Sequence, residues 1–263
     1  MQEPFHNKQR LLPFKYINNF RDVGGYQTSQ SQSIAWRKIY RSGQPGPLEE
    51  DDIQLFHSLG IRLILDLRSD DEESGSYKTY LTDISTQIIN LPVIPGGTKS
   101  FMAVLRGSEA DSDEIARFMC GLYSKMVLDY ADIFRNMFRA ILACESGPIL
   151  IHCAAGKDRT GIAVALLMSA LDVPVQTITD DYMLSKEYLD NVQLLGRFSR
   201  QHGLDGSERY MPLIQVRRDY LNTAFAVIKS ECGGIDHYLE QRLGLGKEQR
   251  RLLKSRFLVQ VPG

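Results

Sequence analysis

One short segment limits the possible folds of this 263-residue chain more than any other. Residues 149–153 form a brief run of mainly branched apolar residues, and residues 160–171 follow as an almost wholly apolar helical pattern. Only a short glycine-containing loop separates the two. A strand buried on both faces and a helix buried all round both need further layers of structure around them. The segment therefore predicts the core of an α/β domain.

Three other brief apolar runs, at residues 34–40, 62–67 and 87–91, are rich in branched aliphatic side chains and are bounded by Gly, Pro or Asn. We interpret them as strands that are buried on both faces. A helical pattern over residues 47–60 has proline near its first turn, acidic residues at its start and a closing glycine. Strand, helix and strand with short connections predict a parallel sheet with right-handed crossovers.

Longer stretches carry apolar residues at three- and four-residue spacing, which is typical of helices. These stretches are residues 115–126, 130–144, 175–189 and 211–228. The first two suggest a helical pair inserted over about residues 95–130, and residues 234–258 predict a C-terminal helical hairpin. No repeat, low-complexity tract or linker divides the chain. We therefore expect one α/β domain over residues 1–263, with a central, mostly parallel sheet of four to five strands flanked by helices.

The charge balance argues against several classes of partner. Lysine and arginine total 31 against 32 aspartate and glutamate residues, so the surface as a whole lacks the positive field that nucleic acid attracts. No apolar run reaches the roughly 18 residues of a membrane span, and the first residues show no signal-peptide pattern. We expect no nucleic acid, no integral membrane segment and a cytoplasmic location, while export without a signal peptide stays open. The sequence predicts no oligomeric state.

The four cysteines show neither a CxxC pair nor zinc-ligand spacing, so we expect reduced thiols and no metal site. One of them, Cys153, lies in the loop after residues 149–152, five residues before Arg159. This C-x5-R spacing lets one loop surround a tetrahedral dianion with inward N–H groups, a helix N-terminus and a planar guanidinium. The same field favours the thiolate form of Cys153, a nucleophile aimed at phosphorus. An inert buried cysteine is the simpler alternative.

A nucleotide-binding loop of the GxxxxGK[ST] type does not fit, because position 152 is His and position 158 is Asp. Residues 152–161, His-Cys-Ala-Ala-Gly-Lys-Asp-Arg-Thr-Gly, instead resemble the signature of the bacterial cysteine-dependent tyrosine and phosphoinositide phosphatases. Other segments match this family in order, so the resemblance covers nearly the whole chain. They are residues 19–25, 40–43, 59–69, 181–185 and 234–258.

The resemblance implies the cysteine-phosphatase fold and two-step hydrolysis through a phosphocysteine, with inorganic phosphate as product and no cofactor. The expected substrates are phosphorylated proteins, phosphotyrosine above all and also phosphoserine or phosphothreonine, or phosphoinositide headgroups. Cys153 would attack, and Arg159 with the loop amides would stabilise the phosphoryl oxygens. Thr160 would hydrogen-bond the thiolate or simply begin the helix. The loop residues expected to bind substrate are Ala154, Ala155, Gly156, Lys157 and Thr160.

The general acid is harder to assign. Many relatives carry an aspartate on a separate loop before the nucleophile, but residues 121–125 contain no carboxylate. The resemblance to mycobacterial members of the family implies that the aspartate at position 158 is the acid. A carboxylate beside a bound dianion is also favoured in its protonated form, which suits a proton donor. A helix cap or a partner for an arginine is the alternative role. Lys157 is expected at the pocket rim, either binding a polyanionic headgroup or merely solvated.

Four residues outside the anion-binding positions are expected to support the site: His152, Arg68, Asp22 and Arg41. His152 would brace the loop or transfer a proton. Arg68 ends a strand, where α/β sheets bind ligands, and would contact substrate or pair with Asp66. The inserted helical pair would form either a lid or ordinary core. Its apolar candidates are Phe101, Met102, Phe118, Met119 and Tyr123.

Two other classes of function stay open: a module that binds phosphorylated partners without turnover, and a sulfur- or arsenate-handling enzyme on a similar loop. The intact set of Cys153, Asp158 and Arg159 favours turnover.

Overall fold

The computed structural model describes residues 10–46, 48–72, 86–94 and 110–261. Its central sheet has five strands in the order β1-β3-β6-β4-β5. Strands β3, β6, β4 and β5 are parallel, and only β1 runs antiparallel, against β3. The mostly parallel sheet expected from the sequence is confirmed. The strands are β1 Arg21–Asp22, β3 Ile39–Ser42, β4 Leu63–Asp66, β5 Gln87–Asn90 and β6 Ile149–His152.

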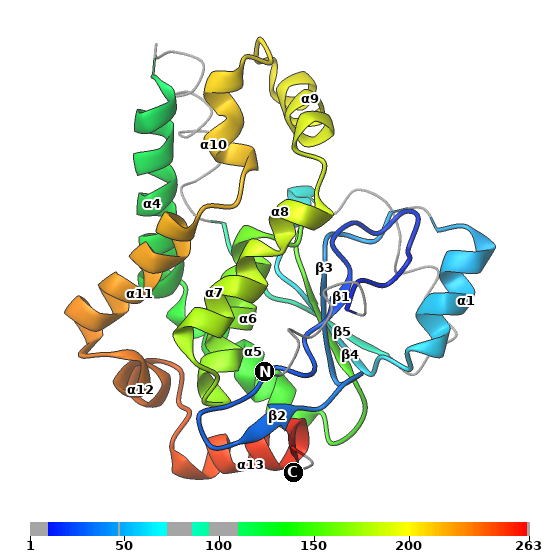
Figure 1. The fold of residues 1–263 in the computed structure, drawn as a ribbon, viewed down its shortest axis with the longest axis vertical. Coiled ribbons are helices and arrows are strands. Elements are labelled where there is room, and N and C mark those ends of the chain that lie inside the picture. The colour runs from blue at the N-terminus through cyan, green and yellow to red at the C-terminus, as the bar shows by residue number, and fades with distance from the viewer. Residues whose placement is uncertain (1–9, 47, 73–85, 95–109, 262–263) are drawn as a thin grey trace, which may run out of the picture.

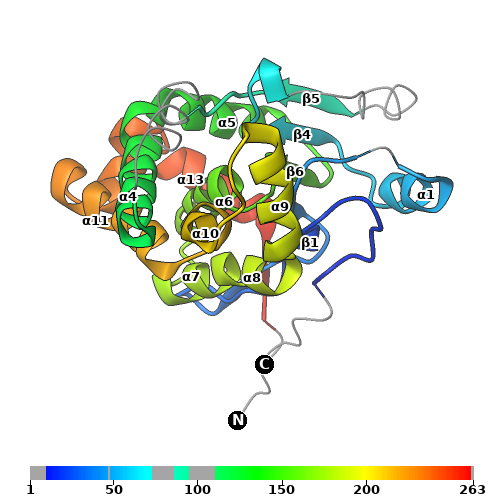
Figure 2. The same ribbon diagram turned by 90° about the horizontal axis from the view of Figure 1, so that it is seen from above.

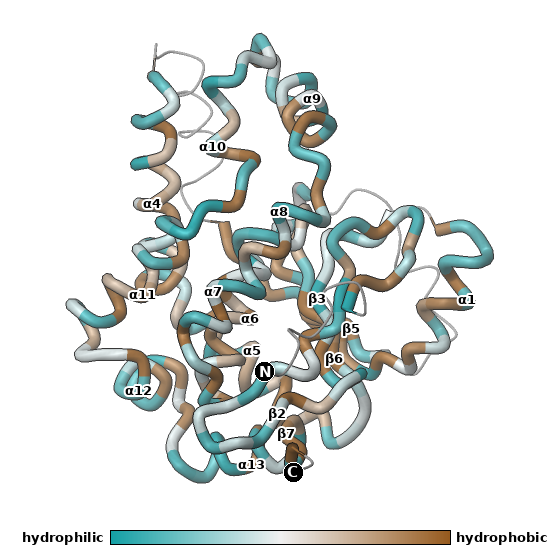
Figure 3. The backbone as a smooth tube through the Cα atoms, viewed as in Figure 1, coloured by the Kyte–Doolittle hydropathy of each residue, from teal (hydrophilic) through white to brown (hydrophobic). Residues whose placement is uncertain are grey.

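Helices cover both faces of this sheet (Figures 1 and 2). On one face, Phe56 of α1 (Glu50–Ser58) belongs to a core cluster that includes Ile64 and Leu150. On the other face, Leu63 and Ile149 belong to the main core. Alternate residues of one strand thus face opposite layers, as the two-residue period of a strand requires. The hydropathy colours place the most apolar stretches along the central strands (Figure 3).

The main core is built around α6 (Asp158–Ala170), in which ten of the thirteen residues are buried, and this confirms the expected all-round apolar helix. Other helices surround it or extend the same layer (Figure 1). They are α4 Ser112–Asp129, α5 Ala131–Ala143, α7 Val175–Met183, α8 Ser185–Tyr188, α9 Asn191–His202, α10 Met211–Ile214 and α11 Arg218–Cys232. Among the described residues, none of these helices has the length and apolarity needed to cross a bilayer.

Two strand predictions were wrong. Residues 34–40 are not one strand, because Arg37 turns the chain with a φ of 60° and its N–H donates to the Asp22 carboxylate at 2.6 Å. The run divides into β3 and β2 (Gln32–Ile34), and β2 pairs with β7 (Leu258–Gln260) in a separate two-stranded sheet. β5 is not buried on both faces, because it lies at the sheet edge with exposed or half-buried side chains.

Several helix predictions needed smaller corrections. Residues 175–189 form α7 and α8, and residues 211–228 contain α10 and most of α11, with an extended residue, Gln215, after α10. Helix α9 was not predicted. The C-terminal hairpin consists of α12 (Ile235–His237), a π-helical segment (Tyr238–Arg242) and α13 (Lys247–Phe257). Short 3-10 turns occur at Asp70–Glu72 and Glu208–Tyr210.

The predicted inserted pair corresponds to α4 and α5, but its bounds stay a prediction because residues 95–109 lie outside the described residues. Phe101 and Met102 belong to that outside segment. Met119 and Tyr123 are buried in the main core, and Phe118 packs against it. In the described part of the pair, these apolar side chains thus serve as core rather than as an exposed cover.

Candidate active site

The candidate site is the joint between β6 and α6. β6 ends at His152 and α6 begins at Asp158, so residues 153–157 turn the chain at the carboxyl end of a central strand. Open α/β sheets bind ligands at this edge. Cys153 is only 3% exposed and belongs to the same core cluster as α6. The nucleophile candidate is therefore held by packing on a rigid strand end.

Three consecutive carbonyl groups of the loop are held from outside it. The carbonyl of residue 154 accepts a hydrogen bond from the Gln44 backbone N–H at 3.0 Å. The Asn19 side-chain amide donates to the carbonyls of residues 155 and 156, at 3.3 and 2.9 Å. The Arg41 guanidinium also donates to the carbonyl of residue 156, at 3.0 Å. All three carbonyls are thus directed toward donors from other segments.

This arrangement decides where the loop amides point. A trans peptide directs its N–H opposite to its C=O, and the described chain has no cis peptide bond. The N–H groups of residues 155–157 therefore face away from Gln44, Asn19 and Arg41. A row of N–H groups on one side of a loop at a helix start is an anion-binding arrangement.

Gly156 makes this packing sterically feasible. Its φ is +69°, and a Cβ added there would lie 2.3 Å from the carbonyl carbon and oxygen of Ser42. Backbone atoms of β3 cannot move aside as a flexible side chain can. Glycine is therefore required where the loop crosses the end of β3.

The Arg159 guanidinium is held by an acid that sequence reasoning missed. Its two terminal nitrogens donate to the two carboxylate oxygens of Glu72, each at 2.6 Å. Burial alone would lower the pKa of Arg159, but the hydrogen bonds that it donates to Glu72 and the negative charge of that carboxylate raise the pKa overall. The same arginine outweighs burial at Glu72 and lowers the pKa of that carboxyl. In the sequence, the one sign of such a partner is the run of four acidic residues at positions 70–73, after β4.

Asp158 lies in the first turn of α6, with its side chain 24% exposed. One carboxylate oxygen, Oδ1, accepts a hydrogen bond from the Tyr123 hydroxyl at 2.5 Å. The other, Oδ2, lies 3.3 Å from the Lys157 ammonium. Tyr123, expected only as a lid or core residue, therefore contacts the candidate acid directly.

Lys157 is not the solvated rim residue that one of the expectations described. Its side chain is 5% exposed, and Nζ donates to the carbonyl of Leu213 at 2.6 Å. The reason is that the last carbonyls of α10 lack helical partners and attract a nearby donor. Lys157 thus connects the loop to α10.

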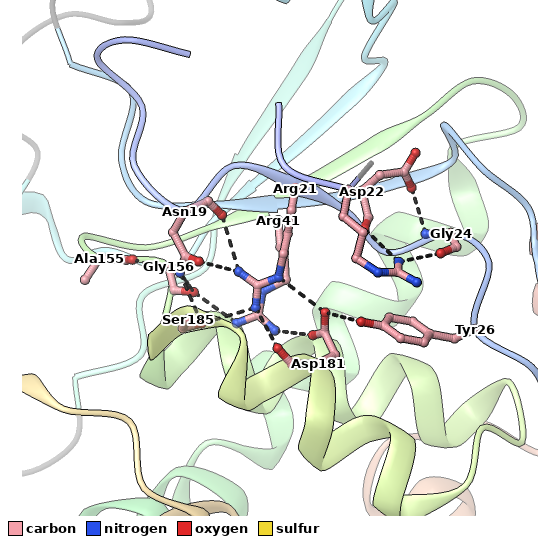
Figure 4. A network of polar contacts seen from close by, with 11 residues as sticks. Asn19, Arg21, Asp22, Gly24, Tyr26, Arg41, Ala155, Gly156, Asp181 and Ser185 are labelled. Atoms are coloured by element: carbon pink, nitrogen blue, oxygen red, sulfur yellow. Dashed lines mark hydrogen bonds and ion pairs between the residues drawn. The ribbon is translucent and has the colours of Figure 1, made fainter. Parts of the chain in front are cut away.

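A buried ion-pair network lies beside the loop and contacts it (Figure 4). The Asp181 carboxylate pairs with Arg41 at 2.6 Å and with Arg21 at 3.3 Å. Arg21 in turn donates to the Asn19 side-chain oxygen and to the Ser185 hydroxyl. Burial would raise the pKa of Asp181, but the two arginine charges outweigh it and lower the pKa to about 2. Asp181 therefore orients two of the side chains that hold the loop carbonyls.

A second buried group lies under the start of the loop. Arg68 pairs with Asp66 at 2.7 Å and also donates to the Gln44 side chain. Asp66 Oδ2 lies 3.7 Å from Nε2 of His152, and burial lowers the pKa of His152 to about 4. His152 is therefore neutral near pH 7 and packed among charged neighbours. The positions of His152 and Arg68 fit roles in holding the start of the loop in place.

Two expected residues lie elsewhere or lack their expected contacts. The carboxylate of Asp22, at the end of β1, accepts N–H bonds from Gly24 at 2.7 Å and from Arg37 at 2.6 Å, so its hydrogen bonds among the described residues are with these turns and not with residues 153–159. The Thr160 hydroxyl is buried and has no hydrogen-bond partner within the described ranges. Its contact with a thiolate stays a prediction.

The Asp181 network generates a stability prediction. Asp181→Asn leaves two buried guanidinium groups without their carboxylate, so the free energy of unfolding should fall by about 3–5 kcal/mol in chemical denaturation. The neighbouring Asp180→Asn is the matched control, because Asp180 is 52% exposed and pairs with exposed Arg218. That variant should lose less than about 1 kcal/mol. Equal losses in both variants would contradict the central role of Asp181.

His152 makes stability depend on pH. The unfolded histidine takes up a proton near pH 6.5, whereas the folded one resists protonation down to about pH 4. The contribution of neutral, buried His152 to the free energy of unfolding is complete above pH 6.5. It should fall by roughly 3 kcal/mol as the pH drops to 4. Denaturation curves of wild type and His152→Gln across this range test this, since the variant should show a shallower decline. Parallel declines would show that other groups dominate.

Comparison with known proteins finds relatives that are named phosphatases. The sequence profile described as the tyrosine phosphatase family matches residues 12–259. A Cupriavidus necator protein with a provisional tyrosine-protein phosphatase name is 29% identical, over 91% of this chain and 86% of its own length. A Nostoc commune tyrosine-protein phosphatase is 27% identical, over 82% and 72%.

The triple specificity protein phosphatase PtpB of Mycobacterium tuberculosis is 26% identical, over 84% of this chain and 90% of its own length. The family match covers nearly the whole chain and includes the loop, the sheet and the helices that hold them. The chain belongs to the tyrosine phosphatase family.

Proposed function

We propose that this protein hydrolyses phosphotyrosine monoesters, with Cys153 as the nucleophile, Arg159 as the main phosphate ligand and Asp158 as the general acid. The observation that carries the proposal is the outward anchoring of the carbonyls of residues 154–156. It turns the intervening N–H groups to one side, between a buried cysteine and a guanidinium held by Glu72.

In the first step, the sulfur of Cys153 attacks phosphorus. The S–P bond forms while the bond between phosphorus and the ester oxygen breaks, and Asp158 transfers its proton to the leaving oxygen. Arg159 and the loop N–H groups stabilise charge on the three equatorial oxygens. Because Glu72 fixes the guanidinium beforehand, little reorganisation accompanies the reaction.

In the second step, water attacks the phosphocysteine. Asp158, now ionised, accepts a proton from that water, the S–P bond breaks, and phosphate leaves with the thiolate restored. One carboxyl group thus acts first as acid and then as base. Its partly exposed position at the start of α6 gives it access to both the ester oxygen and water.

The substrate class follows from the depth of the nucleophile. A cysteine that is only 3% exposed is reached more easily by a phosphate on the long, planar tyrosine side chain than by one on serine. The mycobacterial relative is named a triple specificity protein phosphatase, which supports a substrate range wider than phosphotyrosine for this chain. Phosphoinositide headgroups are a weaker candidate, because the Lys157 ammonium is already bound to Leu213 and Asp158. The four free cysteines favour a cytoplasmic location.

The first test removes the nucleophile. Wild type should hydrolyse an aryl phosphate and a phosphotyrosine peptide in the presence of a chelator. Cys153→Ser should lower kcat on the order of a thousandfold or more. Cys144→Ser is the control, because Cys144 lies after α5, where its thiol contacts the carbonyl of Ser146. A wild type that binds the phosphopeptide without turnover would instead support a binding module.

The second test addresses the acid. Asp158→Asn should slow alkyl phosphates by about 10²–10⁴-fold, because a poor leaving oxygen needs a proton. Aryl phosphates with acidic leaving groups should be slowed far less. Asp129→Asn is the control, since Asp129 is an exposed residue at the end of α4. Equal slowing of both substrate types by Asp158→Asn would move the acid role to another residue.

A further inference from the structure

Two buried tyrosines form a hydrogen-bonded chain that ends on Asp158. Tyr123, from α4, donates to Oδ1 of Asp158 at 2.5 Å. The hydroxyl of Tyr182, from α7, lies 2.7 Å from that of Tyr123. Both side chains are at most 1% exposed. Side chains from α4 and α7 thus meet at the first turn of α6.

The direction of the chain follows from the number of protons. A phenol has one proton to donate, and Tyr123 uses it on the carboxylate. Tyr182 must then donate to the Tyr123 oxygen. Burial, reinforced by the charge of Asp158, raises the pKa of each tyrosine well above the ordinary value for a phenol. They therefore remain protonated donors and are unsuited to giving up a proton to the substrate themselves.

The rings are fixed by packing. Tyr182 lies so close to Gly161 of α6 that an added Cβ would be 2.8 Å from its ring. The Tyr123 ring packs 5.5 Å from that of Tyr220 and 6.3 Å from that of Tyr182. The position of the Tyr123 hydroxyl is therefore set by the core. A hydroxyl in such a place, desolvated and aimed at a charge, makes a strong and directional hydrogen bond.

The second carboxylate oxygen has a different environment. Oδ2 lies 3.3 Å from the Lys157 ammonium, whose shorter bond of 2.6 Å goes to the Leu213 carbonyl. Because Tyr123 occupies Oδ1 as a donor, a proton on Asp158 is placed on Oδ2. The hydrogen bond from Tyr123 to Oδ1 thereby determines that Oδ2 is the oxygen that carries the proton.

We propose that Tyr123 is the positioning residue of the general acid: its hydroxyl, oriented by Tyr182, holds Oδ1 of Asp158 so that Oδ2 delivers the proton to the leaving oxygen. This inference rests on the acid role proposed for Asp158. The tyrosine itself touches neither substrate nor phosphoryl group, and it acts only through the orientation of the carboxyl.

The test uses Tyr123→Phe, which keeps the ring and removes the hydroxyl. With alkyl phosphates, kcat should fall about tenfold, the effect of losing one hydrogen bond to a charged group, while KM stays within about twofold. With an aryl phosphate that has an acidic leaving group, kcat should stay within about twofold. In an Asp158→Asn background, Tyr123→Phe should have no further effect on alkyl phosphates, because the two residues act as one unit.

Tyr238→Phe is the matched control. It removes an equally buried hydroxyl, which donates to the carbonyl of Val127 on the same helix α4 at 2.6 Å. This variant should lose stability comparably without changing the ratio of alkyl to aryl rates. If Tyr123→Phe behaves like Tyr238→Phe, or if its effect multiplies with that of Asp158→Asn, the positioning role is refuted. If instead wild type shows no turnover, or Asp158→Asn slows both substrates equally, the proposed function or its acid assignment fails first.

Discussion

The whole site depends on one constraint: a loop can offer its N–H groups to an anion only if its carbonyl groups are satisfied on the opposite side. Here Asn19, Arg41 and the Gln44 backbone supply the donors. Two of these donors depend on a buried carboxylate, Asp181, because it balances Arg41 and Arg21 in a region that excludes water. A buried ion pair with these partners is therefore best understood as a device that orients the backbone, and its contribution to net stability is secondary.

The same logic applies to the charged groups above the loop. The guanidinium of Arg159 is fixed by two short bonds to Glu72, so its geometry is present before any substrate arrives. Glu72 reduces the net positive charge at the site. In return, the Arg159 guanidinium would need no reorientation to bind a dianion. Asp158 is located in a similar way, by the hydrogen bond from the Tyr123 hydroxyl to Oδ1 and by the Lys157 ammonium 3.3 Å from Oδ2. Arg159 and Asp158 thus each have a partner contributed by a distant part of the chain.

Comparison of expectation and structure shows where sequence reasoning works. The buried strand at residues 149–152 and the apolar helix after it were predicted because each has a clear periodicity and the two are adjacent. Residues 34–40 were misread because an apolar run contains no sign that Arg37 adopts a positive φ and that the Asp22 carboxylate accepts its N–H. Lys157 was expected at the rim because lysines are mostly exposed, whereas unsatisfied carbonyls at the end of α10 draw its ammonium inward.

The sequence by itself predicted the chemistry of the anion loop, because the cysteine, glycine, aspartate and arginine all lie within residues 153–159, where their spacing along one short loop limits the geometry. Only the tertiary structure decided which groups hold them. Glu72 lies 87 positions from Arg159, and Tyr123 lies 35 from Asp158. Such pairings depend on which surfaces the helices and strands bury together, and the free energy that selects them comes from desolvation and packing in three dimensions. No local pattern of residues records that outcome.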